Sequence, residues 1–516
     1  MTPDKDGYLS HRQILVVLGG LLTGMFLSAL DQSIVGTALP RITSDLGGLD
    51  KLSWVVTAYL LTATASTPLW GKISDLYGRR PLFQIAILIF IFGSLLAGFA
   101  QNIEQLIAFR AVQGLGGGGL MALAIATIGD VVPPRERARY QGYIAAVFGT
   151  ASVLGPVLGG WFADGPGWEW IFFINVPIGA VALVVTSAAL KMKHVRREHS
   201  IDYLGAAILV ASVSAILLYT AWAGGEFGWG AWDALVYLVS GLGLAVVFVF
   251  VERRATEPIL PLALFSNPIF RVSAGFGFLV AMAMFGAMVF LPIYLQVVDG
   301  MSPTESGLAM IPMVVGLFGA SISAGQYMSR TGHYKRLPPS GAAVTIVGLV
   351  LLSSMGTDTP YWFAGLAMFV MGAGLGMTMQ VLIVAVQNSV DRSDMGVATS
   401  SIQFFRQMGG AFGTALFGAV MSHQLTHHLA SGAAPASGDL ANNVERIKEL
   451  PEPMHGIVTG AFANSLQDVF IVAIPLVVVA LGIGLLLKEI PLAVRQQPSD
   501  AVTDAVDAEA AVTAAK

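Results

Sequence analysis

Long apolar runs constrain the fold of this chain more than any other feature. A helix needs about 20 apolar residues to cross a bilayer. The chain is only 12% charged, whereas soluble globular chains are about 25% charged. We therefore predict an all-α integral membrane protein with fourteen transmembrane helices. Their approximate spans are 14–39, 53–72, 81–100, 105–128, 141–163, 170–190, 204–223, 234–251, 271–297, 305–327, 338–355, 360–385, 396–421 and 465–487.

The charges of the predicted loops indicate how the chain is oriented. If the N-terminus is cytoplasmic, 22 of the 28 Lys and Arg residues fall in inward-facing loops or tails, and 4 fall in outward-facing loops. This asymmetry is the positive-inside signal. We expect a multi-pass protein of the plasma (inner) membrane with both termini in the cytoplasm. The two remaining bases, Arg110 and Arg406, fall inside predicted membrane helices.

A polar turn occurs twice between apolar runs. Residues 71–80 read GKISDLYGRR, and a weaker copy occupies residues 325–336 with its glycines also seven apart. Similarity between two hydrophobic halves is typical of transporters built from repeats. Because the two copies follow helices 2 and 10, we predict two matching six-helix bundles with helices 7 and 8 inserted between them.

These positions define the predicted domains. A cytoplasmic N-terminal segment covers 1–13, the first six-helix bundle 14–190, and the inserted helix pair with its linkers 191–270. The second bundle covers 271–490 and includes a predicted extracellular loop at 422–464. Residues 491–516 are rich in alanine and acidic side chains, a composition that favours a disordered cytoplasmic tail.

Two opposite charges are expected to meet inside the first bundle. Asp31 lies in helix 1, and charged residues inside membrane helices are rare and usually functional. Arg110 lies in helix 4 with Gln113 three residues later on the same face. At about 1.5 Å per residue, Arg110 and Asp31 lie about 10 and 12 Å below the outer boundary. The pair is one interpretation, and the alternative is that Arg110 binds only backbone carbonyls.

Other candidate residues lie on helices 5, 12 and 13. A stripe of small residues on helix 5 allows close helix approach and a bend at its proline, although close packing alone also explains it. Its members are Ala145, Gly149, Ser152, Pro156 and Gly159. Gln380, Gln403 and Arg406 are candidate cavity lining, with substrate contact and helix–helix hydrogen bonding left open. Asp468 is a second intramembrane acid, nearer the outer surface.

Several chemistries find no support in the sequence. The chain has no cysteine, which excludes disulfides and thiol chemistry. His423, His427 and His428 have metal-like spacing, but no cysteine or close carboxylate completes a site, so we expect no metal. We interpret these histidines as an extension of helix 13 into the outer loop. The glycines at 114–119 follow no strand, and no P-loop or nucleophile elbow is present. We therefore expect neither an enzyme nor a cofactor, and no nucleic-acid partner.

The motifs together resemble those of the fourteen-helix drug:proton antiporters of the major facilitator superfamily, the QacA/EmrB-like group. The resemblance covers nearly all of residues 14–490. One departure is Ser329, which stands in the second copy of the turn where the first has Asp75. The matching segments are Asp31 with Ala38-Leu39-Pro40, Gly71–Arg80, Arg110–Gly114, Gly155-Pro156 with Gly159-Gly160, Trp170–Gly179 and Asp202–Gly205.

This resemblance implies a monomeric, proton-coupled exporter of amphiphilic small molecules that works by alternating access in a lipid membrane. It assigns proton coupling to Asp31, Arg110 and Gln113. A dedicated exporter of one lipid, siderophore or self-made antibiotic is an alternative, and a non-transporting receptor or scaffold is a remote one. It also implies that conformational change depends on Gly71, Asp75, Gly78, Arg79, Arg80, Gly155, Pro156 and Gly159. Asp75, at the cytoplasmic end of helix 2, could meet either Arg79 or the positive end of a helix in the other half.

Overall fold

The computed structural model describes residues 11–46, 52–132, 134–189, 202–223, 230–255, 258–391, 394–431, 451 and 453–492. Every predicted span falls on helix within these ranges. The loop at 191–201, most of the segment 1–13 and the tail from 493 onward lie outside the described residues. Eleven described helices are long and apolar enough to cross a membrane, and Leu337–Ser353 is a shorter apolar helix. The count of fourteen crossings therefore stays a prediction.

The first half contains seven helices in place of the six predicted spans. The span 170–190 is divided at Ile174, because Pro177 has no N–H to donate to the carbonyl four residues earlier. The helices of the first half are α1 (His11–Leu46), α2 (Leu52–Tyr77), α3 (Arg79–Gly98), α4 (Ile103–Val131), α5 (Pro134–Asp164), α6 (Trp170–Phe173) and α7 (Asn175–Ala189).

The inserted pair is α8 (Tyr203–Ala223) and α9 (Trp232–Glu252). Helix α8 packs on both α2 of the first half and α15 of the second, and α9 packs on α8. The outer face of α9 exposes large apolar side chains such as Val239, Val246 and Phe250. An apolar face of this kind suits contact with lipid. The pair therefore covers the seam between the halves from one side.

The second half also departs from its predicted spans. The span 305–327 is divided at Met310, next to Pro312, and the predicted loop 422–464 is helical at both ends. The elements of the second half are η2 (Leu262–Ser266), α10 (Pro268–Val297), α11 (Pro303–Ala309), α12 (Ile311–Thr331), α13 (Leu337–Ser353), α14 (Tyr361–Gln387), α15 (Met395–Ser431) and α18 (Met454–Leu485).

The loop 422–464 is shorter than predicted because side chains beyond the apolar runs join α15 to α18. Asp468 of α18 accepts hydrogen bonds from Gln424 Nε2 at 2.6 Å and contacts His428 Nε2 at 3.0 Å. These contacts hold the last turns of α15 against α18, and residues 432–450 lie outside the described part of the chain.

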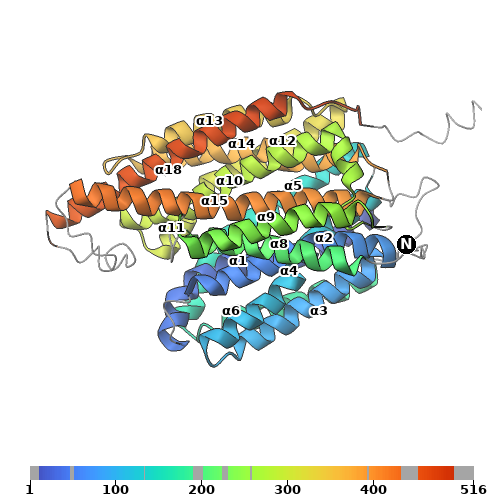
Figure 1. Cartoon of the computed structure of the whole chain (residues 1–516). Coiled ribbons are helices and arrows are strands. Elements are labelled where there is room, and N and C mark those ends of the chain that lie inside the picture. The colour runs from blue at the N-terminus through green and yellow to red at the C-terminus, as the bar shows by residue number, and fades with distance from the viewer. Residues whose placement is uncertain are drawn as a thin grey trace, which may run out of the picture.

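A buried cluster joins Ala65 of α2 and Met408 of α15 with residues of α8, and the larger cluster that the two halves share lies at one end of the bundle. We call this the motif end, because it holds residues 71–80, and the opposite end the far end. At the motif end one buried cluster combines Ile125 and Ile128 of α4 with Val384 of α14 and Ala398 of α15. At the far end each half has its own cluster. The start of α1 and the end of α18 both lie at the motif end (Figure 1).

Candidate functional site

A buried ion pair lies inside the first half. Arg110 Nη1 of α4 donates to Asp31 Oδ2 of α1 at 2.5 Å. The two side chains are 1% and 0% exposed. Asp31 and Arg110, which were expected at similar depths in the membrane, are therefore in direct contact. Two charges buried this completely are tolerated only when they are paired and hydrogen-bonded.

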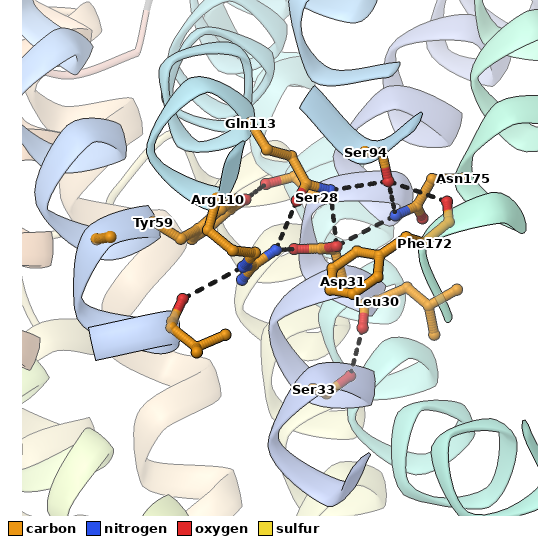
Figure 2. A network of polar contacts seen from close by, with 12 residues as sticks. Ser28, Leu30, Asp31, Ser33, Tyr59, Ser94, Arg110, Gln113, Phe172 and Asn175 are labelled. Carbon is orange, nitrogen blue, oxygen red and sulfur yellow. Dashed lines mark hydrogen bonds and ion pairs between the residues drawn. The ribbon is translucent and has the colours of Figure 1, made fainter. Parts of the chain in front are cut away.

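Amides and a hydroxyl complete the network around Asp31 (Figure 2). Gln113 Oε1 accepts from Arg110 Nη1 at 2.7 Å, and Gln113 Nε2 donates to Asp31 Oδ1 at 2.8 Å. Asn175 of α7 donates to the same Asp31 oxygen at 3.1 Å. Ser94 Oγ accepts from both amides and donates to the carbonyl of Phe172. The carboxylate thus receives three side-chain hydrogen bonds from two helices.

The remaining faces of the guanidinium are also occupied. Arg110 Nε donates to the carbonyl of Val55 at 3.3 Å, so the alternative of carbonyl binding holds together with the ion pair. The Tyr59 ring lies 4.3 Å from Arg110 Cζ, a distance typical of a cation–π contact. The Tyr59 hydroxyl in turn bonds Ser28 at 2.8 Å.

Close packing of α2 against α4 positions this network. A Cβ on Gly114 would lie 3.0 Å from the carbonyl carbon of Tyr59, and one on Gly117 would lie 2.9 Å from Cζ of its ring. The two glycines therefore let α2 approach closely enough for Tyr59 to cover Arg110. This is the physical reason for small residues on the polar face of α4.

A second charged cluster lies at the motif end. Asp75 Oδ1 pairs with Arg79 Nη2 at 2.5 Å, and Arg79 Nε pairs with Asp130 Oδ2 at 2.7 Å. The other Asp75 oxygen accepts from the backbone N–H of Val397 at 3.0 Å. The sequence left two partners open for Asp75, Arg79 or a helix end in the other half, and the structure shows both.

The two glycines of this turn are needed for different reasons. Gly78 has φ 95°, a left-handed conformation that costs other residues about 1–2 kcal/mol. Gly71 faces the other half, where an added Cβ would lie 2.6 Å from Cβ of Ser400. Gly78 therefore makes the turn, and Gly71 lets α2 touch α15. Arg80 points elsewhere and donates to the carbonyl of Ser187 at 2.8 Å.

Small residues of α5 pack against α1 and α12. A Cβ on Gly155 would lie 2.6 Å from Cβ of Ser33, and one on Gly149 would lie 2.6 Å from Cζ of Phe318. Gly159 is buried, and the side chain of Pro156 is outside the described part. Helix α5 thus packs closely on the first half and across the seam on the second.

The polar residues of the second half do not join the Asp31 network. Arg406 of α15 makes one described polar contact, from Nη1 to the Met379 sulfur at 3.8 Å. Gln380 and Gln403 are buried, and neither carbonyl oxygen has a hydrogen-bond partner among the described residues. The three residues lie on the two neighbouring helices α14 and α15. His428 and His423 lie on α15, where His428 contacts Asp468.

Sequence reasoning missed four residues of these clusters. Asn175, Ser94 and Tyr59 belong to the Asp31 network, and Asp130 belongs to the Arg79 cluster. One available signal was an asparagine inside the apolar run of helix 6, followed two residues later by a proline. Ser94 and Tyr59 gave no such signal, because single hydroxyls are common in membrane helices.

Comparisons with known proteins agree with this architecture. Residues 21–414 match the model of the Major Facilitator Superfamily. Multidrug transporter protein MdtP of Bacillus subtilis is 40% identical over 422 residues, which cover 82% of this chain and 77% of that protein. Multidrug resistance protein 3 of Bacillus subtilis is 34% identical over 481 residues, covering 90% and 94%.

A solved structure shows the same fold at low identity. The proton:xylose symporter XylE has a TM-score of 0.60 and 13% identity, with 90% of this chain and 95% of that chain covered. The family model alone covers more than half of this sequence. The chain therefore belongs to the Major Facilitator Superfamily, whose members are membrane transporters rather than enzymes.

Proposed function

We propose that this transporter exports lipophilic and amphiphilic compounds in exchange for protons. The observation that carries the proposal is the Asp31–Arg110 pair, which is 2.5 Å long and almost fully buried. Such a costly pair inside a membrane protein needs a role, and proton transfer is the chemistry a carboxylate offers. The names of the two Bacillus relatives support efflux of more than one compound.

The proposed cycle is alternating access with the motif end in the cytoplasm of a bacterial-type inner membrane. The joint core and the Asp75–Val397 bond close the motif end, while the far end has separate clusters. This arrangement suits an outward-facing or occluded state. A single chain contains the whole proposed pathway, so we propose that the monomer is the working unit.

The proton step follows from the contacts of Asp31. A carboxylate that holds a guanidinium and two amides remains charged. If α4 moves away from α1, Arg110 leaves, and a buried carboxylate without a counter-ion is costly. Uptake of one proton from the outer water removes that charge. When the pair re-forms in the inward-facing state, the proton leaves to the cytoplasm, and Gln113 orients both groups throughout.

The energy available fits export against a gradient. One charge crossing 100 mV is worth about 2.3 kcal/mol, and about 1.4 kcal/mol corresponds to a tenfold gradient. For an uncharged substrate, one proton at roughly 150 mV therefore sustains a gradient of a few hundredfold.

The test is transport in proteoliposomes that contain the purified full chain and an imposed pH gradient. Wild type should pump tetraphenylphosphonium and other amphiphiles uphill, and a proton uncoupler should stop it. Asp31→Asn should lose uphill pumping but keep downhill exchange. Uphill pumping by Asp31→Asn at near-normal rates would remove Asp31 as the proton carrier. Transport of one compound from a broad panel would instead favour a dedicated exporter.

A further inference from the structure

Arg406 differs from Arg110 in having no countercharge within the described part of the chain. The chain continues from α14 into α15, and Arg406 lies eleven residues after the start of α15 at Met395, which is about 16 Å along the helix. Its contact with the Met379 sulfur is its one described polar interaction. No carboxylate among the described residues lies within the 4.0 Å that defines an ion pair.

Buried amides surround this position. Gln403 lies one turn before Arg406 on the same face of α15, is 3% exposed, and has an unpartnered carbonyl oxygen. Gln380 is 7% exposed with an unpartnered carbonyl oxygen on α14. Buried polar groups without partners are rare in native structures. Three polar side chains that leave hydrogen-bonding groups unused therefore point to a missing ligand.

The register of α14 and α15 brings Gln380 to the level of Arg406. Near the motif end, Gln387 Nε2 of α14 donates to Thr399 Oγ1 of α15 at 3.2 Å. The two helices run in opposite directions from the short connection between them. Seven residues are close to two helical turns, so the same faces meet again at Gln380 and Arg406. Met379, which contacts Arg406, is the neighbour of Gln380 and confirms this level.

An apolar wall continues the same face of α15. Gly410 lies one turn beyond Arg406, and a Cβ there would lie 2.7 Å from the Phe285 ring of α10. The ring therefore stands directly against the glycine. Arg406 thus has amides one turn to one side, an aromatic ring one turn to the other, and a methionine sulfur in contact. A charged group next to an apolar wall matches an amphiphile with one anionic end.

We propose that Arg406 binds the anionic group of an exported amphiphile, a carboxylate, sulfonate or phosphate on a lipophilic body. The carbonyl oxygens of Gln380 and Gln403 accept from hydrogen-bond donors of the substrate beside its anionic group, and Phe285 contacts the lipophilic body. The inference rests on the proposed export function and names a substrate class for it. Guanidinium groups suit such anions, because their fixed donors match two anion oxygens at once.

The charge balance of the cycle follows. One proton moving inward and one anion moving outward both carry positive charge toward the cytoplasm. Export of a monoanion should therefore respond to membrane potential, whereas exchange of a monovalent cation for one proton moves no net charge. The two substrate classes therefore differ in how strongly the membrane potential drives their export. A potassium diffusion potential imposed across the vesicle membrane measures this difference directly.

The experiment compares two permanently charged probes in phosphatidylcholine proteoliposomes, the anion 1-pyrenesulfonate and the cation tetraphenylphosphonium. Arg406→Gln should lower export of 1-pyrenesulfonate by about tenfold or more, the loss expected when a charge-assisted hydrogen bond is removed. Export of tetraphenylphosphonium should not fall, because removing a positive charge does not weaken the binding of a cation. Arg406→Lys keeps the charge and should retain anion export, and Arg41→Gln is the matched exposed control.

The possible outcomes separate the two claims. If neither probe moves in wild type, the proposed export function fails. If the cation moves and the anion does not, or Arg406→Gln exports the anion normally, export stands and the anion site is wrong. Loss of both probes in Arg406→Gln assigns the guanidinium a structural role and also overturns the site. Adding phosphatidylglycerol to the vesicles distinguishes the source, because a lipid headgroup site predicts competition with 1-pyrenesulfonate.

Discussion

The Asp75 carboxylate of α2 accepts a hydrogen bond at 3.0 Å from the backbone N–H of Val397, two residues after the start of α15. The first turn of a helix carries unpaired N–H groups and a partial positive charge, which stabilise a carboxylate. Arg79 holds the same carboxylate from the other side and links it to Asp130. One side chain thus fastens the first half to the second at the motif end.

Asp75→Asn should weaken this closure without unfolding the protein, because asparagine keeps the shape and loses the charge. Contacts of this kind are worth about 0.3–2 kcal/mol. The chain has no cysteine, so a cysteine introduced by Ala385→Cys in the joint core would be the single thiol. The rate at which a thiol reagent labels it would report solvent access to the motif end. We expect its labelling rate to rise about twofold to thirtyfold.

The matched control for that experiment is Asp45→Asn, which removes an exposed carboxylate paired with Arg41 at 3.5 Å. This control should leave labelling of Cys at position 385 unchanged. Equal labelling rates in Asp75→Asn and in the parent would show that the bond to Val397 does not hold the halves together.

Gly71→Ala should open the motif end by steric conflict. The new methyl group would stand 2.6 Å from Cβ of Ser400 across the seam, closer than such atoms approach. Ser400→Gly removes the opposing group, so the double variant should recover much of the parent behaviour. Labelling of Ala385→Cys and transport rate measure the effect. Absence of any recovery in the double variant would place the damage within α2 itself.

Much of this fold was predictable because membrane helices carry a strong signal. The apolar runs located each described helix, and the polar turn at 71–80 located the contact between halves. The breaks at Ile174 and Met310 were within reach, since Pro177 and Pro312 stand beside them. The extension of α15 into the loop 422–464 was predicted from its histidines and is confirmed. The start of α18 at Met454 was not predicted.

The site was predictable where charge demanded a partner. Asp31 and Arg110 each needed an opposite charge, and helix depth placed them together. Asn175 could not be found in this way, and the helix end expected beside Asp75 could not be assigned to Val397 of α15. An amide has many possible partners in a sequence, and a backbone N–H has no sequence identity. The sequence also could not show that Arg406 has no carboxylate partner among the described residues. That became evident only when its neighbours in the structure were known.

The positive-inside asymmetry predicts that the start of α1 and the end of α18 face the cytoplasm. The structure places both at the motif end (Figure 1). A reporter that is active only in the cytoplasm, fused after residue 516, should be active. A second fusion within residues 432–450 should be inactive. A silent C-terminal fusion that is well expressed would contradict this orientation.

Stability at acid pH should depend on Glu489, which lies beyond the end of α18. Partial burial acts to raise the pKa of this carboxyl, but hydrogen bonds from the N–H groups of Tyr334 and Lys335 and the nearby His333 lower it overall. A lowered pKa gives stability that is present above the ordinary value of 4.5 and is lost as pH falls through the folded value.

The corresponding measurement is thermal unfolding of the purified protein in detergent between pH 7 and pH 3. Wild type should unfold at a higher temperature than Glu489→Gln at pH 7, and the difference should shrink toward pH 3. Glutamine can still accept from Tyr334 N–H, which is 2.9 Å from the carboxylate. A difference that is independent of pH would mean that the charge of Glu489 contributes nothing.

Arg110→Lys should impair coupling while the fold survives. The guanidinium reaches Asp31, Gln113 and the carbonyl of Val55 from two separate nitrogens. A lysine ammonium is a single point with a flexible stem and cannot span these partners in the same geometry. We expect proton-driven uphill export to fall by about tenfold or more, with normal expression.

Arg110→Ala should be more damaging, because it leaves the buried Asp31 without a counter-ion, at a cost of about 3–5 kcal/mol. The double variant Asp31→Asn with Arg110→Gln removes both charges and should recover expression and thermal stability. It should not recover uphill export, because no group remains that can carry the proton. Expression level, unfolding temperature and pumping in proteoliposomes separate these effects. Uphill pumping by the double variant would show that the proton travels by another acid, with Asp468 the next candidate.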